Sequence, residues 1–201
     1  MNIFAIESSS KKCSIAIHSN NGVHESFDGI DNDSATSLPI MTEKILTTLS
    51  LEFSDLDAIA ISMGPGSFTG LRVGLSYAKG LSLALDIPII PISTFDLLLI
   101  PNIKHIEDEV ISVLIHSHGT TVYQSRYIFK NKTYVLETDP SSISINNISH
   151  ENNGTILYCG PEHLLNSINE LSSKIHIVTP SVSDVIDIGM KNFDLLKTKS
   201  I

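Results

Sequence analysis

The stretch GPGSFTGLRVG at residues 64–74 decides the fold of this 201-residue chain. It follows a short apolar segment, residues 56–62, that is typical of a buried strand, and it opens a helix expected over about 69–85. Two glycines around a proline allow a sharp turn with positive φ, and Ser67 or Thr69 can cap the helix. The stretch therefore predicts a strand–turn–helix unit.

A helix that begins after a glycine turn can bind an anion at its amino terminus. The glycines here are spaced G-x-G-x-x-x-G, however, so the dinucleotide fingerprint is absent, and no Gly-Lys-Ser/Thr follows as in a P-loop. Three interpretations of Gly64, Gly66 and Ser67 stay open: a structural turn, a phosphate contact, or a close packing contact.

The helix after the turn carries small residues every four positions, at Gly70, Gly74 and Ala78. Its polar stripe is narrow, so the helix must be covered nearly all round. One face can pack on the sheet of its own chain, and the small-residue face can receive a second helix closely. That second helix belongs either to the same chain, at 36–49, or to a partner subunit. The predicted interface comprises Gly70, Leu71, Gly74, Tyr77, Ala78, Leu38, Met41 and Ile45.

The flanking segments complete an α/β pattern. A β-meander, a helix from Ser34 or Ser37 to about Leu49, and a second helix capped by Ser93 surround the glycine turn. The expected strands cover 2–6, 13–19, 23–27, 56–62 and 87–92, and Asn20-Asn21-Gly22 forms the hairpin turn. The order βββαβαβα is that of an RNase H-like domain.

After a break near Pro101 the three-strand opening recurs without its glycine loop. The expected strands are 109–116, 121–130, 133–137, 155–158 and 175–178; residues 139–153 are expected to be loop, and helices are expected over 161–171 and about 181–191. The recurrence predicts two related α/β subdomains, 1–101 and 102–201, with mixed sheets and flanking helices.

Composition narrows the class of protein. A hydrophobic fraction of 42% is typical of a compact globular chain, and the longest apolar stretch, 81–92, is too interrupted for a membrane span. Cys13 and Cys159, with no leader sequence, predict reduced thiols in the cytosol. The formal net charge is −9 and lysines and arginines do not cluster, so we expect any RNA to be held chiefly by other proteins.

Other candidate sites are weaker. His116 and His118 lie two apart on one strand and could touch one metal, but two ligands rarely suffice, so solvated histidines are favoured. Cys159 has no evident basic partner that would activate a thiol. Ser67 lacks the G-x-S-x-G elbow of a serine hydrolase.

The sequence resembles the TsaB (YeaZ) family. The resemblance rests on residues 64–74 with Ala78-Lys79-Gly80-Leu81, on Ile87-Pro88, Ser93-Thr94 and Leu38-Pro39, and on the opening Ala5-Ile6-Glu7-Ser8-Ser9. It implies an actin/Hsp70-type (ASKHA) fold built of two RNase H-like subdomains. It also implies a cytoplasmic, non-catalytic subunit in the synthesis of threonylcarbamoyladenosine in tRNAs that read codons beginning with A.

The resemblance implies partners as well: the catalytic paralogue TsaD, the ATPase TsaE, a second copy of the chain when alone, and tRNA only through the complex. The first-domain helices form the family's dimer interface. No cofactor or metal is implied for the subunit itself, although ATP or ADP with magnesium at a joint interface remains an alternative.

Two departures matter. The catalytic paralogue carries a His-x-x-x-His metal pair near its first long helix, whereas residues 31–37 here read DNDSATS, without a histidine. The second half also departs from the family at 116–123, and its C-terminal segment is missing. The competing hypothesis is a self-contained ATPase or kinase of the same fold, using Glu7, Ser8 and the loop from Gly64 to Gly70.

Overall fold

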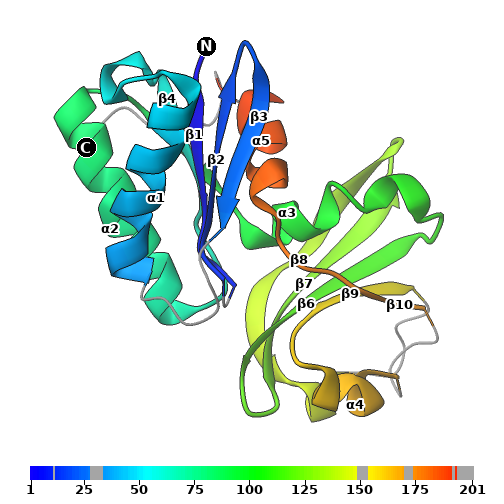
Figure 1. Ribbon diagram of the computed structural model, residues 1–201. Coiled ribbons are helices and arrows are strands. Elements are labelled where there is room, and N and C mark those ends of the chain that lie inside the picture. Colours follow the sequence, from blue (N-terminus) through cyan, green and yellow to red (C-terminus); the bar gives the residue numbers. More distant parts are fainter. Residues whose placement is uncertain (11, 28–33, 149–153, 170–173, 192, 194–201) are drawn as a thin grey trace. The chain divides into compact units, whose positions relative to one another are not determined.

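The chain divides into two compact units, each with one five-stranded mixed sheet (Figure 1). The computed structural model describes residues 1–10, 12–27, 34–148, 154–169, 174–191 and 193. The first unit comprises Met1–Leu97 together with the segment that starts at Pro180, and the second comprises Leu98–Thr179.

The first sheet has the strand order β3-β2-β1-β4-β5. Its strands are β1 (Ile3–Glu7), β2 (Ser14–Ser19), β3 (Gly22–Phe27), β4 (Ala58–Ser62) and β5 (Ile89–Ile92). The first three form the predicted antiparallel meander, and β4 and β5 join it in parallel. Every residue of β1 and β4 is buried, which explains why these strands are apolar on both faces.

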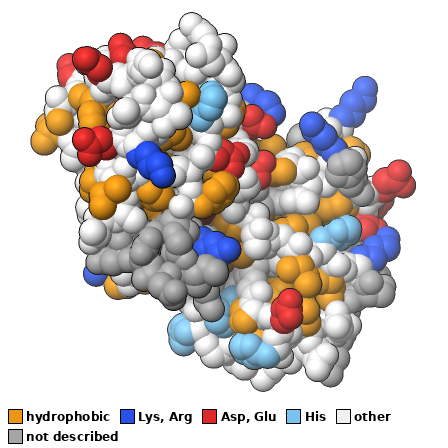
Figure 2. All heavy atoms as spheres, in the orientation of Figure 1, with side chains coloured by type: hydrophobic (Ala, Val, Ile, Leu, Met, Phe, Trp, Pro, Cys, Tyr) orange, Lys and Arg blue, Asp and Glu red, His pale blue; other side chains and the backbone are white. Residues whose placement is uncertain are grey.

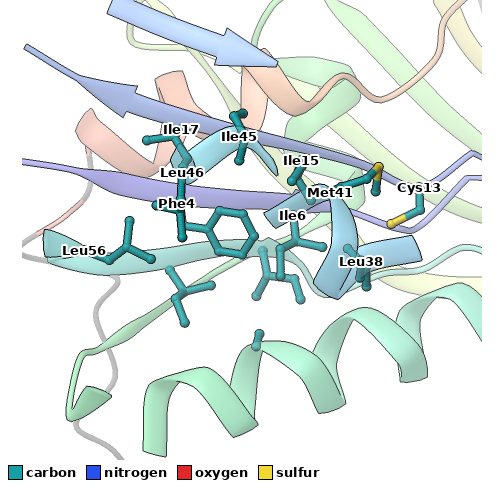
Figure 3. Packing of buried hydrophobic residues seen from close by; sticks show 13 residues of the cluster. Phe4, Ile6, Cys13, Ile15, Ile17, Leu38, Met41, Ile45, Leu46 and Leu56 are labelled. Atoms are coloured by element: carbon teal, nitrogen blue, oxygen red, sulfur yellow. The ribbon is translucent and has the colours of Figure 1, made fainter. Parts of the chain in front are cut away.

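Helices cover both faces of this sheet (Figure 1). Helices α1 (Ser34–Leu49) and α2 (Phe68–Leu85) lie side by side on one face. Apolar side chains of α1 meet those of β1, β2 and β4 in the core shown in Figure 3. Helix α3 (Thr94–Leu99) follows β5, and the Ser93 hydroxyl accepts a hydrogen bond from the Phe95 amide, as its predicted capping role requires.

The second face of the first sheet is covered by α5 (Val182–Lys191), the last described helix. Gly189 lets α5 approach closely, because a Cβ there would lie 3.0 Å from the Ala60 Cβ. We predicted that all of 102–201 would form the second subdomain, and for α5 that prediction is wrong. Since β1 and β4 are apolar on both faces, they need a helix on each, and α5 supplies the second.

The second sheet has the order β10-β9-β6-β7-β8. Its strands are β6 (Val110–His118), β7 (Thr121–Lys130), β8 (Thr133–Ser144), β9 (Thr155–Cys159) and β10 (Ile175–Ile177). The first three are antiparallel, and β9 and β10 are added in parallel on the other side of β6. Both sheets thus share one topology, which confirms the predicted pair of related RNase H-like folds.

Two elements of the second unit differ from the prediction. Strand β8 runs on to Ser144 through a segment that we predicted to be loop; because β8 is an edge strand, Pro140 removes no bond from a second neighbour. The predicted helix over 161–171 is short: a 3-10 turn, Glu162–Leu164, leads into α4 (Leu165–Asn169). None of the helices in the described ranges is long and apolar enough to cross a membrane.

Asp108 ties together the starts of the three parallel strands of the second unit. Its carboxylate accepts a hydrogen bond of 2.6 Å from the Thr155 hydroxyl at the start of β9. The Lys174 ammonium, just before β10, lies 2.5 Å from the other carboxylate oxygen. Lys174 and then Thr155 hold the pKa of Asp108 below its ordinary value of 3.8.

Asp108→Asn should lower the free energy of unfolding at neutral pH by about 1–2 kcal/mol, since it removes a charge-assisted pair. A lowered pKa in the folded state stabilises the protein above the ordinary pKa, and this contribution fades as pH falls through the lowered value. Urea titrations at several pH values measure the effect. The difference in free energy of unfolding between wild type and variant should vanish in acid. A difference independent of pH would contradict a stabilising role of the Asp108 carboxylate. Thr155→Val, which keeps the ion pair, is the matched control.

Candidate functional site

The glycine loop meets the turn after β1 at the carboxyl ends of the parallel strands β1 and β4. Glu7 ends β1 and is 1% exposed. Its carboxylate accepts hydrogen bonds from the Ser9 amide, at 2.8 Å, and from the Ser9 hydroxyl. The Ser8 amide donates to the Ser62 hydroxyl at the end of β4, at 3.2 Å. The turn is therefore held in a single arrangement by buried polar contacts.

Backbone contacts fix the loop against that turn. The Ser67 amide donates to the Ser9 carbonyl at 2.7 Å, and the Thr94 amide donates to the Gly64 carbonyl at 2.9 Å. Gly64 has φ +97°, where side chains are strained. A Cβ on Gly66 would lie 2.2 Å from the Ser9 carbonyl oxygen. Glycine is thus needed in the loop for conformation at one position and for close approach at the other.

This geometry favours packing over phosphate binding. The structure does bring together Glu7, Ser8, Gly64, Gly66 and Ser67, the residues that we singled out as candidates for a nucleotide site. However, the Ser67 amide is bonded to the chain's own Ser9, and the Ser67 hydroxyl caps α2 by accepting from the Gly70 amide at 3.2 Å. Burial raises the pKa of Glu7, although its hydrogen bonds oppose that shift.

The small-residue stripe of α2 faces its own sheet. A Cβ on Gly70 would lie 2.3 Å from the Ser8 carbonyl oxygen, and one on Gly74 would lie 2.2 Å from the Ser8 hydroxyl. Ala78 is fully buried in the core. The stripe is therefore occupied by the chain's own turn and sheet, whereas we predicted that it would receive a second helix.

The other predicted interface residues also lie inward to differing degrees. Leu38, Met41 and Ile45 of α1 belong to the core of the first unit (Figure 3). Leu71 and Tyr77 of α2 are half-buried. Of the eight residues predicted for the interface, these two are best placed to reach a partner at the margin of α2.

The opposite side of α1 and α2 is open and partly apolar. Ile40, Phe68 and Leu83 are 61%, 68% and 78% exposed, and the Arg72 guanidinium lies 3.8 Å above the Phe68 ring. Gly80 is exposed, and no atom lies within 4 Å of where its Cβ would be. A glycine inside a helix costs about 1 kcal/mol relative to alanine, and no contact in the described chain requires it. We call Ile40, Phe68, Arg72, Gly80 and Leu83 the outer helix face.

The remaining candidate residues do not come together as a metal site in the described part of the chain. The described residues contain no group of three His, Cys, Asp or Glu side chains that could hold a metal. His116 shares a 3.1 Å hydrogen bond with the Gly119 carbonyl, His118 pairs with the Ser117 hydroxyl, and a bulge separates the two histidines in β6. Of the DNDSATS segment, residues 31–33 lie outside the described part.

Comparison with known proteins agrees with this architecture. The family model described as "TsaD: tRNA N6-adenosine threonylcarbamoyltransferase" matches residues 12–167. The solved structure "YeaZ from Pseudomonas aeruginosa" superposes with a TM-score of 0.81 at 18% identity, covering 99% of this chain and 95% of that one, which shows a common fold. The chain is therefore an RNase H-like protein of the class that includes the threonylcarbamoyltransferases.

Within that class the curated relatives are more specific. A "tRNA threonylcarbamoyladenosine biosynthesis protein TsaB" of Buchnera aphidicola is 30% identical over 98% of this chain and 90% of the relative. The TsaB protein of Escherichia coli is 36% identical over 47% of this chain and 41% of its own length. A tRNA N6-adenosine threonylcarbamoyltransferase of Aromatoleum aromaticum is matched over only 35% of its length. The chain belongs to the TsaB (YeaZ) family.

Gly66→Ala and Gly70→Ala should each destabilise the protein by about 1–3 kcal/mol or more, because the new methyl group would overlap a backbone carbonyl. Gly80→Ala is the matched control on α2 and should stabilise the isolated chain by about 0.5–1 kcal/mol. Thermal and urea unfolding of the three variants measure this. Equal effects at Gly70 and Gly80 would refute the assignment of the inner face.

Glu7→Gln should remove a pH dependence of stability. The folded-state pKa of Glu7 is raised, so its contribution to stability is complete below the ordinary pKa of 4.5 and is lost as pH rises through the raised value. Glutamine keeps a carbonyl oxygen for the Ser9 donors but does not ionise. The stability of the variant relative to wild type should therefore increase from pH 4 upward, as followed by urea denaturation; a constant difference would mean that Glu7 titrates normally.

Proposed function

We propose that this chain is a non-catalytic subunit that pairs with a TsaD-type catalytic paralogue in tRNA threonylcarbamoyladenosine biosynthesis. Its TsaB relatives carry that pathway in their names and support the role at this level. The proposal extends to a TsaE-type ATPase as a third component and to tRNAs that read codons beginning with A, as the family resemblance implies.

The outer helix face is the observation that carries the proposal. It combines three well-exposed apolar side chains, Ile40, Phe68 and Leu83, with a helical glycine that the described chain does not need. Exposed apolar groups rimmed by polar residues are typical of protein–protein contacts. A glycine at such a place allows a second helix to approach α2 closely. A partner's helix packed here would cover the apolar side chains, and its close approach would explain a glycine at position 80.

The same face could pair two copies of the chain when the catalytic paralogue is absent. The homodimer and the heterodimer would then compete, since one face cannot serve both. The alternative of a self-contained ATPase has less support, because the loop amide of Ser67 and the carboxylate of Glu7 are both engaged within the chain.

Leu83→Glu and Gly80→Leu should weaken co-purification with the catalytic paralogue at least about tenfold, because each disturbs a face that would be buried in the complex. Both positions are exposed in the isolated chain, so the melting temperature should stay close to wild type for Leu83→Glu and should stay equal or rise slightly for Gly80→Leu. Gly74→Leu and Ala78→Leu would not test the interface, since bulk there disrupts the subunit's own core.

Phe27→Glu is the control for that experiment, because Phe27 is a comparably exposed apolar residue, 62% exposed, on the edge strand β3 and outside the outer helix face. It should leave the complex intact. An undiminished complex with both outer-face variants would refute the interface, and native mass spectrometry of the mixture would show which dimer forms.

A further inference from the structure

The lysines of the second unit gather at one end of its sheet, where β6, β9 and β10 start and β7 turns into β8. Residues 98–179 contain five lysines and arginines. The only arginine among them, Arg126, pairs with Glu137 at 2.6 Å. The four lysines lie near the starts of β6 and β10 and at the β7–β8 turn, at Lys104, Lys130, Lys132 and Lys174. We call these four lysines, together with His176 and Phe129, the lysine edge.

Hydrogen bonds show that this edge is continuous. At the base of the β7–β8 turn, the Tyr134 hydroxyl donates to the Asp108 carbonyl at 2.5 Å, and the Phe129 amide donates to the Glu109 carbonyl at 2.8 Å. The Asp108 carboxylate in turn holds Lys174. Beside this ion pair lies an open pocket of about 690 Å³, lined by Lys104, Lys174 and His176 together with Glu107 and Asp108.

Figure 2 shows the same distribution on the surface. Basic side chains project over the β7–β8 turn and again over β10, and acidic side chains lie between them. The neighbouring carboxylates are Asp108, which pairs with Lys174, and Glu107 and Glu109, which are exposed. Among the described residues, Lys104, Lys130 and Lys132 have no carboxylate within ion-pair distance. The edge therefore offers three lysine charges outside the ion pairs of the described residues, beside the exposed carboxylates of Glu107 and Glu109.

The backbone conformation of the β7–β8 turn is unfavourable for lysine, which favours a functional role for Lys132. Asn131 and Lys132, its two central residues, have φ of +51° and +68°. A two-residue hairpin turn with positive φ at both central residues prefers glycine at the second of them. Lysine in the left-handed region is strained where glycine would not be. The chain thus places an exposed positive charge at a position where glycine would fold better.

An aromatic side chain stands beside these charges. Phe129 is 49% exposed and precedes Lys130, and its ring centroid lies 5.1 Å from that of Tyr134. Because the Tyr134 hydroxyl is hydrogen-bonded to the backbone of the neighbouring segment, the Phe129 ring is supported in place. An exposed aromatic ring near lysines at the end of one hairpin is suited to a polyanion with flat groups, which is the chemistry of single-stranded RNA.

We propose that the lysine edge contacts the phosphate backbone of an unpaired RNA segment, with Phe129 available to stack on a base. The inference rests on the proposed function, in which the complex acts on tRNA. It adds that this subunit touches the RNA directly instead of serving its partner only. The alternative occupant, an acidic protein surface, becomes an outcome of the test.

The test measures the affinity of the reconstituted complex for an unmodified tRNA transcript over a range of salt concentrations. Lys130→Glu with Lys132→Glu should weaken binding at low salt and reduce the slope of log K against log salt by about 0.7 for each phosphate that is no longer neutralised. Lys132→Gly should also weaken binding while keeping or raising the melting temperature of the chain, an outcome that a structural role for Lys132 would not produce. Lys191→Glu on α5 is the control of equal charge change per residue.

Each result has a clear meaning. Unchanged affinity and salt slope in an intact complex would overturn the RNA contact alone. Loss of a protein component with normal tRNA binding would overturn it in favour of an acidic protein partner. Failure of the wild-type chain to assemble, seen first by native mass spectrometry, would refute the proposed function; the same titration on the isolated chain would then decide the RNA contact.

Discussion

The first unit depends on how closely the glycine loop approaches the turn after β1. Gly66 and Gly70 admit the carbonyl oxygens of Ser9 and Ser8 to distances that no side chain would allow. That contact sets the start of α2, and the stripe that continues through Gly74 keeps the helix pressed on the sheet. The packing of this inner face also determines which residues of α2 face away from the sheet. The loop thus determines which residues remain on the surface and so what the subunit can bind.

Sequence reasoning recovered the strands best, because the alternation of apolar residues and the turn at Asn20-Asn21, followed by Gly22, are local signals. It also found Ser67 and Ser93, since a helix cap needs a hydroxyl at one position. It failed on the face of α2. Small residues at four-residue spacing show that something lies close to the helix, but not whether that neighbour is the chain's own sheet or another subunit. Gly80, outside the stripe, was the more informative glycine, because a glycine out of register with the inner face has no packing duty.

The second unit shows a different limit. The recurrence of three antiparallel strands predicted its topology, which both sheets share. The extension of β8 through Pro140 could not be predicted locally, because proline is tolerated only when one side of the strand is unpaired, and that is a property of the sheet. The sheet on which α5 packs could not be predicted locally either. Its apolar face shows that the helix packs on something, but two sheets were available to receive it.

The return of α5 has a consequence for synthesis of the chain. Residues 98–179 form one uninterrupted segment, whereas the first unit needs a helix that is translated only after that segment. Its sheet therefore leaves the ribosome with one apolar face still bare, and that face stays uncovered while the whole second unit is made. The second unit can reach its own fold in the meantime, since domains generally fold as units. The unit that is translated first is thus completed last. Until α5 is translated, the apolar face of its sheet is exposed to chaperones and to wrong contacts with other chains.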